Sequence, residues 1–409
     1  MPAHTSVISA SSLAFSWPDG TPAIASLDLL VPPGRSALVG ANGAGKSTLL
    51  RLLTGELTPT AGHLTVAGTV GYLPQDLTLD VEQTVPAFLG IDPVLVALGA
   101  IEGGSVAQRD FDIVGDDWDI EERTLASLAR LGLPRDVLGR RLGELSGGEV
   151  VQLGLSRLLL ARPDVLLLDE PTNNLDGAAR TRLHDLVAGW TGHVLVVSHD
   201  RELLEHVDRI GELRDGAMRW YGGNIDDYDE QVAAEQASAE QAVSSARADV
   251  WRQRVDRQEA ERLIAQRKRQ GARNAASSNM PKGAQHFWQN RSEKHAAKYR
   301  AVHDDRLEAA RERQCAAEAR LRDDREIRVD LPTTTVPRGR TVLTTNRLTL
   351  RTGAAVELDI HGPDRVAVTG PNGAGKTTLL HTIAGLLDPL SGMIDVAVPV
   401  GLLPQRLDV

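Results

Sequence analysis

The chain has 409 residues, more than one hydrophobic core usually serves, so we expect two or more domains. Its 45 Lys and Arg residues against 55 Asp and Glu give a net charge of −10, which excludes a protein coated evenly in basic charge. Its apolar runs are far shorter than the roughly 18 residues of a membrane span, and no secretory leader or disulfide framework is expected, since Cys315 is the one cysteine. We therefore expect a cytoplasmic protein.

Two segments of the chain repeat each other. Residues 40–77 and 370–407 align without a gap, and 21 of their 38 positions are identical. Each contains the pattern G-x-x-x-x-G-K-[ST] between a short apolar stretch (36–39 and 366–369), which predicts a strand, and a helix-like stretch. The glycines allow backbone N–H groups to surround a phosphate at the start of a helix, so both copies predict a nucleotide-binding loop.

The residue types within the two loops predict separate roles. Lys46 and Lys376 are expected to reach the β- and γ-phosphates of ATP, and Ser47 and Thr377 to place a hydroxyl on Mg²⁺. The other predicted ATP-binding positions are Gly40, Asn42, Gly43, Ala44, Gly45 and Thr48 in the first loop and Gly370, Asn372, Gly373, Ala374, Gly375 and Thr378 in the second.

An ordered series of motifs follows the first loop and resembles the ATP-binding cassette (ABC) ATPases. Ser146, Gly147, Gly148 and Glu149 form the stretch LSGGE with Leu145, which is similar to the signature of that family and which we expect at the nucleotide. The run Val165–Leu168 then leads into two acids, a pattern typical of a buried strand. The resemblance implies an α/β P-loop NTPase fold and an ATPase that converts ATP and water to ADP and phosphate.

The two acids carry the predicted chemistry of this site. Asp169 is expected to hold Mg²⁺, and Glu170 to polarise the attacking water. The resemblance implies that His199 is the switch histidine at the γ-phosphate, that Gln75 is the glutamine that also faces the metal, and that Asp176 belongs to the D-loop at the nucleotide.

Two further assignments concern the adenine and the second copy. Trp17 is a candidate for stacking on adenine, although Phe15 competes for that role and a strand aromatic can equally be part of the core. Gln405 is the counterpart of Gln75 in the second copy.

The segment between the repeats predicts two long helices. Neither Gly nor Pro occurs in residues 224–270 or 284–331, whereas residues 271–283 are rich in helix breakers and predict the tip of a hairpin. Helices of about 40 residues would be on the order of 60 Å long. We therefore expect a first ABC domain over 7–228, a helical hairpin over 229–331 and a partial second ABC domain over 340–409.

The hairpin is basic although the whole chain is acidic. Residues 251–300 hold 13 Lys and Arg against 4 Asp and Glu, a local charge of +9. Aromatic residues lie among the basic ones, a composition that favours phosphate contacts and stacking on unpaired RNA bases. The alternative is a solvated hairpin whose aromatics pack between its own helices. The residues concerned are Arg267, Lys268, Arg269, Arg273, Lys282, Arg291, Lys294, Lys298 and Arg300, with Phe287, Trp288 and Tyr299.

Tandem cassettes, a long charged linker and the closing stretch 219–228 together resemble the ABC-F family. This resemblance implies a ribosome-binding ATPase whose hairpin reaches ribosomal RNA and P-site tRNA, as a translation factor or in protection from antibiotics. The alternative is an ATPase subunit that works with separate membrane proteins, for which a long basic hairpin has no evident use. A DNA-repair ATPase would need zinc-binding cysteines or a far longer coiled coil. Val150 and Asn174 depart from the family's usual residues at positions that do not bear on metal or water.

The second copy ends at Val409 without a signature, an Asp-Glu strand or a switch histidine. In the ABC family each ATP lies between the phosphate loop of one domain and the LSGGE of the other. The site of Lys46 would then lack an opposing signature, and the site of Lys376 would lack an acid from its own domain. We therefore expect a single chain to bind ATP but to hydrolyse it poorly. We interpret the chain as truncated, and residues 340–409 as marginally stable, with a homodimer through the first domain as the alternative.

Overall fold

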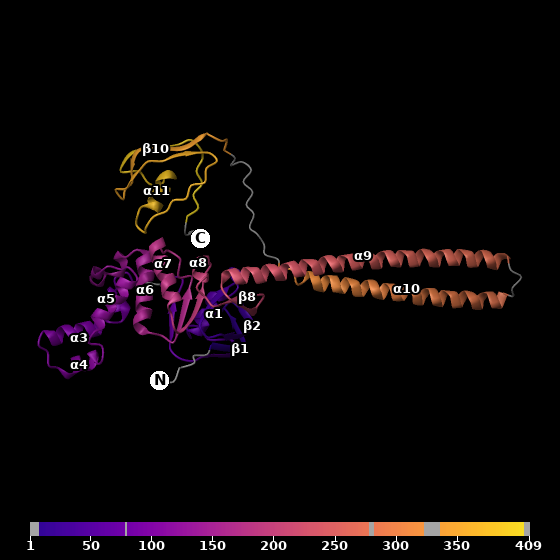
Figure 1. Ribbon diagram of the computed structural model, residues 1–409, viewed down its shortest axis with the longest axis horizontal. Coiled ribbons are helices and arrows are strands. Elements are labelled where there is room, and N and C mark those ends of the chain that lie inside the picture. Colours follow the sequence, from indigo (N-terminus) through magenta and orange to yellow (C-terminus); the bar gives the residue numbers. More distant parts are fainter. Residues whose placement is uncertain (1–7, 78–79, 278–281, 323–335, 405–409) are drawn as a thin grey trace. The chain divides into compact units, whose positions relative to one another are not determined.

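The structure is a computed structural model that describes residues 8–77, 80–277, 282–322 and 336–404, apart from the side chains of 275–277, 282–289, 292–293 and 296. Its backbone contacts divide the chain into two units. One unit contains Met1–Tyr228 together with Asp330–Val409, and the other is Asp229–Val329. We call residues 8–222 the first lobe and residues 336–404 the second lobe of the first unit (Figure 1).

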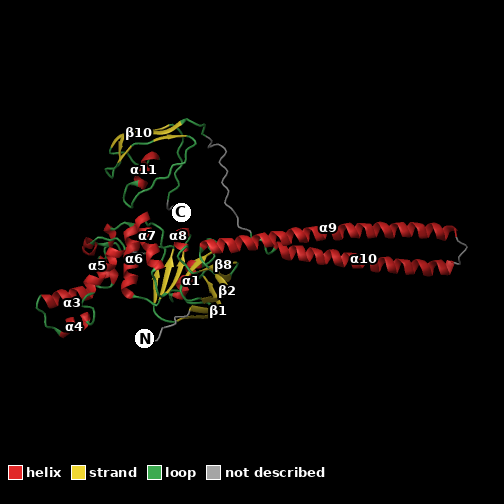
Figure 2. Cartoon of the chain, in the orientation of Figure 1, coloured by secondary structure: helices red, strands yellow, loops and turns green. Residues whose placement is uncertain are grey.

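A six-stranded sheet in the order β5-β6-β7-β3-β8-β9 forms the centre of the first lobe (Figure 2). All its pairings are parallel except that of β8 with β9. Every residue of β6 is buried, as a continuous aliphatic run predicts for a parallel strand covered on both faces. The strands are β3 (Arg35–Val39), β5 (Val70–Leu73), β6 (Val165–Asp169), β7 (His193–Val197), β8 (Arg209–Arg214) and β9 (Ala217–Gly222).

Alternate residues of β6 enter two different hydrophobic clusters. Leu167 packs in the cluster that contains Leu49 of α1 (Lys46–Leu53). Leu168 packs with Leu155 of α6 (Gly147–Ala161) and Leu183 of α7 (Gly177–Ala188). This division follows from the two-residue period of a strand, which sends successive side chains to opposite faces. The carboxyl ends of the central strands are thereby fixed between two packed layers.

Smaller elements complete the first lobe. A separate antiparallel sheet has the order β2-β1-β4, and Leu153 of α6 packs in a third cluster with Phe88 and Leu128. The elements are β1 (Ile8–Ser16), β2 (Pro22–Val31), β4 (Ala61–Val66), α2 (Val85–Leu89), α3 (Asp92–Glu102), α4 (Gln108–Val114), α5 (Ile120–Arg130), η1 (Arg135–Gly139), η2 (Leu142–Glu144) and α8 (Arg201–Leu204).

The second lobe repeats part of this pattern. Strand β10 pairs with β11, β12 and β13, and α11 follows the second phosphate loop. The predicted strand at 366–369 is wrong, because these residues have no strand conformation and Val366 is 54% exposed. In the first lobe, β3 is held between β7 and β8, whereas no described residue of the second lobe supplies such neighbours. The elements are β10 (Thr341–Thr349), β11 (Ala355–Val356), β12 (Asp359–His361), β13 (Ser391–Val396) and α11 (Lys376–Ile383).

Helix α9 (Ile225–Ser277) begins in the first unit and forms, from Asp229 onward, the helical hairpin of the second unit with α10 (Lys282–Glu318). The two helices lie side by side in Figure 1. The helices run antiparallel, because Asp249 pairs with Arg313 at 2.9 Å and Arg257 with Asp304 at 3.0 Å. Val250, Leu307 and Ala310 form a small buried cluster between them. At about 1.5 Å per residue, α9 is about 80 Å long. No helix among the described residues combines the length and apolar composition that crossing a membrane requires.

The predicted ends of the two helices need correction. Helix α9 continues through Gly271 to Ser277, so the predicted tip of 271–283 is too long. One glycine costs a helix only about 1 kcal/mol, and the Ala and Arg residues after it are good helix formers. Helix α10 ends at Glu318 rather than at residue 331, because the absence of Gly and Pro permits a helix but does not extend it. The side chains of Phe287 and Trp288 lie outside the described residues.

Candidate nucleotide-binding site

The first phosphate loop connects β3 to α1. Gly45 has φ 97°, in the left-handed region that favours glycine, and a side chain at Gly40 would come within 2.4 Å of the carbonyl oxygen of Leu213. Both glycines are therefore required by the backbone path. The Lys46 ammonium donates hydrogen bonds to the carbonyl oxygens of Gly40, at 2.7 Å, and Ala41, at 3.0 Å. The loop thus holds the lysine over the space where phosphates would bind.

A cavity of about 670 Å³ opens beside this loop. It brings together predicted residues from positions 17 to 199, because the phosphate loop follows β3 and the acids and His199 follow the neighbouring parallel strands. Trp17 lines the cavity, whereas Phe15 is buried in the core at 7% exposure. The lining comprises Trp17, Thr21, Pro22, Ala23, Asn42, Gly43, Gly45, Lys46, Ser47, Thr48, Gln75, Asp169, Glu170, Asn173, Val197 and His199.

Asp169 lies at the end of β6 with a carboxylate that is suited to a cation. Its Oδ2 accepts a hydrogen bond from the Tyr72 hydroxyl at 3.5 Å, while its buried Oδ1 has no hydrogen-bond partner among the described residues. Burial raises the pKa of Asp169, and a hydrogen bond from Ser47 opposes that rise. A buried carboxylate oxygen beside a hydroxyl is the ligand chemistry that Mg²⁺ prefers, so Ser47 and Asp169 fit a magnesium ion.

Glu170 follows Asp169 in an unusual backbone conformation. Its φ is 46°, in the left-handed region, and its backbone N–H donates to the carbonyl oxygen of Val197 at 2.8 Å. One carboxylate oxygen lies 3.4 Å from Nε2 of His199. Burial raises the pKa of Glu170, and the charge of His199 opposes that rise. The raised pKa moves this carboxyl closer to the range in which a general base is most effective.

The LSGGE stretch is not in this cavity. Ser146 caps the N-terminus of α6, and its backbone N–H donates to the Glu149 carboxylate at 2.8 Å while its hydroxyl accepts from the Glu149 N–H at 3.3 Å. Glu149 therefore has a structural role in the cap. A side chain at Gly148 would come within 2.2 Å of the Asn372 amide nitrogen, so this glycine lies against the second phosphate loop.

Asn372 connects the second phosphate loop to the residues after β6. Its side-chain N–H donates to the carbonyl oxygen of Asn174 at 2.7 Å, and its backbone N–H donates to the Asp176 carboxylate at 3.3 Å. Asp176 also caps α7 by accepting from Ala179 at 2.9 Å. The structure thus brings the signature and the D-loop residue to the second loop and not to the first.

The second loop has the same local form as the first. Gly375 has φ 90°, and the Lys376 ammonium donates to the carbonyl oxygens of Gly370 and Pro371, both at 2.7 Å. Unlike Lys46, Lys376 has no acidic strand end beside it among the described residues of its own lobe. The other predicted positions lie on this loop or in the first turn of α11, namely Gly373, Ala374, Thr377 and Thr378, and Gln405 lies outside the described residues.

Tyr72 and Asn173 belong to the first site but were not predicted from the sequence. Tyr72 belongs to the motif that indicated Gln75, but its contact with Asp169 joins residues 97 positions apart. Asn173 lines the cavity and follows the acids by three residues. A sequence signal existed for Asn173, because polar residues just after a buried parallel strand lie at the sheet edge where ligands bind.

We predict that Asp169→Asn raises the melting temperature of the nucleotide-free chain by a few degrees at neutral pH. Burial raises the pKa of Asp169 above its unfolded value, so its contribution to stability is present below the unfolded pKa and is lost as the pH rises. The gain should therefore vanish at acid pH. The matched control is Asp208→Asn. A hydrogen bond from Arg35 lowers the pKa of Asp208, so loss of this carboxylate should destabilise the fold at neutral pH. Calorimetry should show that the melting temperature rises for Asp169→Asn and falls for Asp208→Asn.

The parallel sheet, the phosphate loop and the cavity define an ATPase domain of the ATP-binding cassette type. The family model for the ABC transporter domain matches residues 25–173 and 354–400. Tylosin resistance ATP-binding protein TlrC of Streptomyces fradiae is 34% identical to this chain, and the similarity covers 94% of this chain and 73% of the length of TlrC. Energy-dependent translational throttle protein EttA of Mycobacterium tuberculosis is 31% identical, over 91% of this chain and 64% of its own. The chain belongs to the ABC-F family of ATP-binding cassette proteins.

Solved structures with similar folds include a dimeric post-hydrolysis state of the ATP-binding cassette MJ0796 bound to ADP and Pi. The similarity covers 53% of this chain and 98% of that one, at 20% sequence identity and a TM-score of 0.41.

Proposed function

We propose that the chain acts on the ribosome in the cytoplasm, as a translation factor or in protection from antibiotics, and that it hydrolyses ATP in the cavity of the first lobe. The observation that carries the ATPase part is that Lys46, Ser47, Asp169, Glu170 and His199 line one cavity. The ribosomal part is supported by the exposed basic hairpin and by the relatives, one named for tylosin resistance and one as a translational throttle.

Seven side chains of the cavity have a proposed task in hydrolysis. Trp17 stacks on the adenine, and Lys46 and the backbone of the loop bind the phosphates. His199 contacts the γ-phosphate, and Glu170 accepts a proton from the attacking water. Ser47 and Asp169, with Gln75, would hold Mg²⁺, which neutralises phosphate charge when bound.

A second ATP site is proposed between the lobes. Its phosphate loop is 370–378 and its signature is 146–149, and the contacts of Asn372 with Asn174 and Asp176 support this pairing. We also propose the domain limits 7–228, 229–331 and 340–409. The alternative arrangement is a homodimer through the first domain, in which the signature 146–149 would face the Lys46 site of the other copy instead of loop 370–378.

The hairpin is the proposed contact with ribosomal RNA and P-site tRNA, through residues 251–300. Arg267, Lys268 and Arg269 are all exposed on α9. Tyr299 is 50% exposed, so it is open to stacking and is not enclosed between the helices. Phosphate contacts by such a basic surface make binding strong at low salt and weak at high salt.

Ribosome pelleting tests this proposal. Purified ribosomes are centrifuged with the full chain in the presence of Mg²⁺-ATP, ADP or no nucleotide, and membrane vesicles are tested in parallel. We expect the chain to pellet with ribosomes only with ATP, and Lys46→Ala to remain in the supernatant because its loop cannot hold the phosphates. Pelleting with vesicles and not with ribosomes would instead support the ATPase subunit of a membrane transporter.

A further inference from the structure

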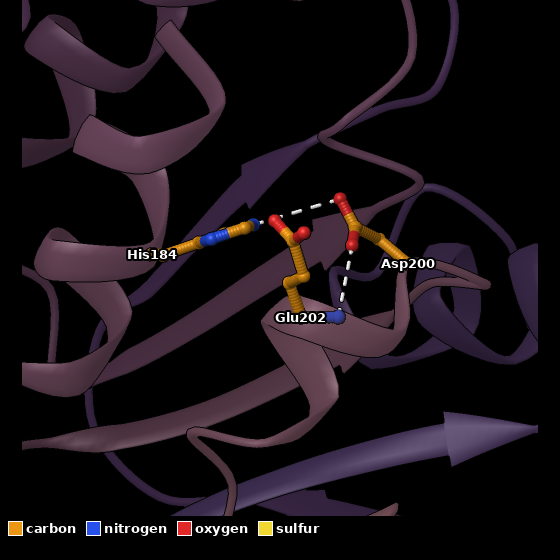
Figure 3. A group of neighbouring side chains, drawn as sticks. All are labelled: His184, Asp200 and Glu202. Atoms are coloured by element: carbon orange, nitrogen blue, oxygen red, sulfur yellow. Dashed lines mark hydrogen bonds and ion pairs between the residues drawn. The ribbon is translucent and has the colours of Figure 1, made fainter. Parts of the chain in front are cut away.

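A cluster of His184, Asp200 and Glu202 lies outside the nucleotide cavity. The three side chains point toward one another in Figure 3, and one ligand atom from each lies within 4.8 Å of the others. His184 is on α7, while Asp200 and Glu202 belong to the start of α8. The cluster therefore joins two segments that are adjacent in the fold but separate in the chain.

Two atoms of this cluster are buried and lack hydrogen bonds. The His184 side chain is 8% exposed and that of Asp200 is 9% exposed. Neither Nε2 of His184 nor Oδ2 of Asp200 has a hydrogen-bond partner among the described residues. Buried polar atoms in native proteins almost always have a partner, so these two atoms require an explanation.

The carboxylate of Asp200 divides its two oxygens between two roles. Oδ1 accepts hydrogen bonds from the backbone N–H groups of Glu202, at 3.1 Å, and Leu203, at 3.4 Å, and so caps α8. Oδ2 points away from the cap, toward His184 (Figure 3). The cap fixes the carboxylate and leaves one oxygen for another ligand.

The spacing of the buried atoms suits a transition-metal ion. Nε2 of His184 lies 3.5 Å from Oδ2 of Asp200. Two ligands at about 2.1 Å from a tetrahedral Zn²⁺ are about 3.4 Å apart, so these atoms already stand at ligand spacing. Glu202 is exposed and can move to complete the set, and water would take the fourth position. An imidazole nitrogen with two carboxylates favours Zn²⁺ or a similar ion over Mg²⁺.

We propose that His184, Asp200 and Glu202 form a site for a divalent transition-metal ion of the Zn²⁺ class. Such an ion would connect α7, which begins after Asp176, to the turn that follows His199. Loading the site would thus connect the segment of Asp176, which faces the second phosphate loop, to the segment of His199, which lines the cavity of the first.

Arg180 is the group that competes with a cation. Its Nε lies 3.3 Å from Oδ2 of Asp200 without making a hydrogen bond, and its side chain is 43% exposed. A bound cation would displace this guanidinium toward solvent. Removing it should therefore tighten metal binding, whereas it should have no such effect if the cluster is only an ion pair.

Binding of Co²⁺ and Zn²⁺ to the full chain, without nucleotide, tests the proposal. We expect Co²⁺ to give the intense visible absorption of a four-coordinate site and Zn²⁺ to displace it, with Mg²⁺ in excess having no effect. His184→Gln should abolish the absorption, and Glu202→Gln, at an exposed position, should weaken binding by at least about tenfold. Arg180→Ala should strengthen it.

The control is His63→Gln, which removes an exposed histidine of β4 and should leave the absorption unchanged. Zn²⁺ should also raise the melting temperature of the parent chain, and should raise that of Glu202→Gln by less. The proposal is overturned if the spectra of the parent, His184→Gln and Glu202→Gln chains are the same, or if the parent gives only the weak absorption of six-coordinate Co²⁺.

Discussion

Glu170→Gln is expected to lower the rate of ATP hydrolysis by about 10²–10⁴-fold while ATP affinity stays nearly unchanged. The amide keeps the size of the side chain but cannot accept a proton from water. Lys46 and the backbone of the loop still bind the phosphates, since they do not depend on Glu170. Single-turnover hydrolysis of radiolabelled ATP measures the rate, and equilibrium binding of a fluorescent ATP analogue measures the affinity.

Glu205→Gln is the matched control, because Glu205 is an exposed carboxylate on the same lobe. It should hydrolyse ATP at the parent rate. The base must be ionised to act, and burial raises the pKa of Glu170, so the parent rate should fall on acidification at a higher pH than an ordinary glutamate would require. If Glu170→Gln hydrolysed ATP at the parent rate, another group would have to activate the water.

Replacing Arg267, Lys268 and Arg269 together by Ala is expected to weaken ribosome binding more than about tenfold at physiological salt. The three residues are exposed, so the change should remove charge without disturbing the packing of the hairpin. The magnitude of the slope of log affinity against log salt should fall by about 2, because a chain that has lost three phosphate contacts releases fewer counterions when it binds. Binding titrations between low and high salt measure both quantities.

A charge-matched triple variant of the first lobe controls for net charge. Arg130, Arg135 and Arg209 are also exposed, and their replacement by Ala removes the same charge from another surface. This variant should keep both the affinity and the salt slope of the parent. Equal losses in the two variants would show that binding follows the total charge and not the hairpin.

Local patterns predicted the parts of the fold that local sequence determines. The aliphatic run before Asp169 predicted β6, and the glycine-rich pattern predicted the path of the phosphate loop into α1. The hairpin followed from a long stretch without Gly and Pro. The tip was predicted too long, because a single Gly271 was counted as a break that the neighbouring helix formers override.

Features that depend on distant partners could not be read from the sequence. The apolar stretch at 366–369 resembles β3, but a strand needs paired neighbours, and the described residues of the second lobe do not supply them. Two contacts join segments that are far apart in the chain, namely that of Tyr72 with Asp169 and that of His184 with Asp200. No spacing pattern in the sequence predicts such contacts. The location of LSGGE against Asn372 was inferred from the family resemblance and not from spacing.

The proposed function joins ATP binding in the first lobe to RNA binding by the hairpin, and cross-linking tests this proposal most directly. A photoreactive amino acid replaces Arg269 in the Glu170→Gln chain, which is mixed with ribosomes and ATP and then irradiated. We predict cross-links to large-subunit ribosomal RNA or to P-site tRNA that disappear without ATP. Absence of RNA cross-links, when the same chain is shown to bind ATP, would contradict the account.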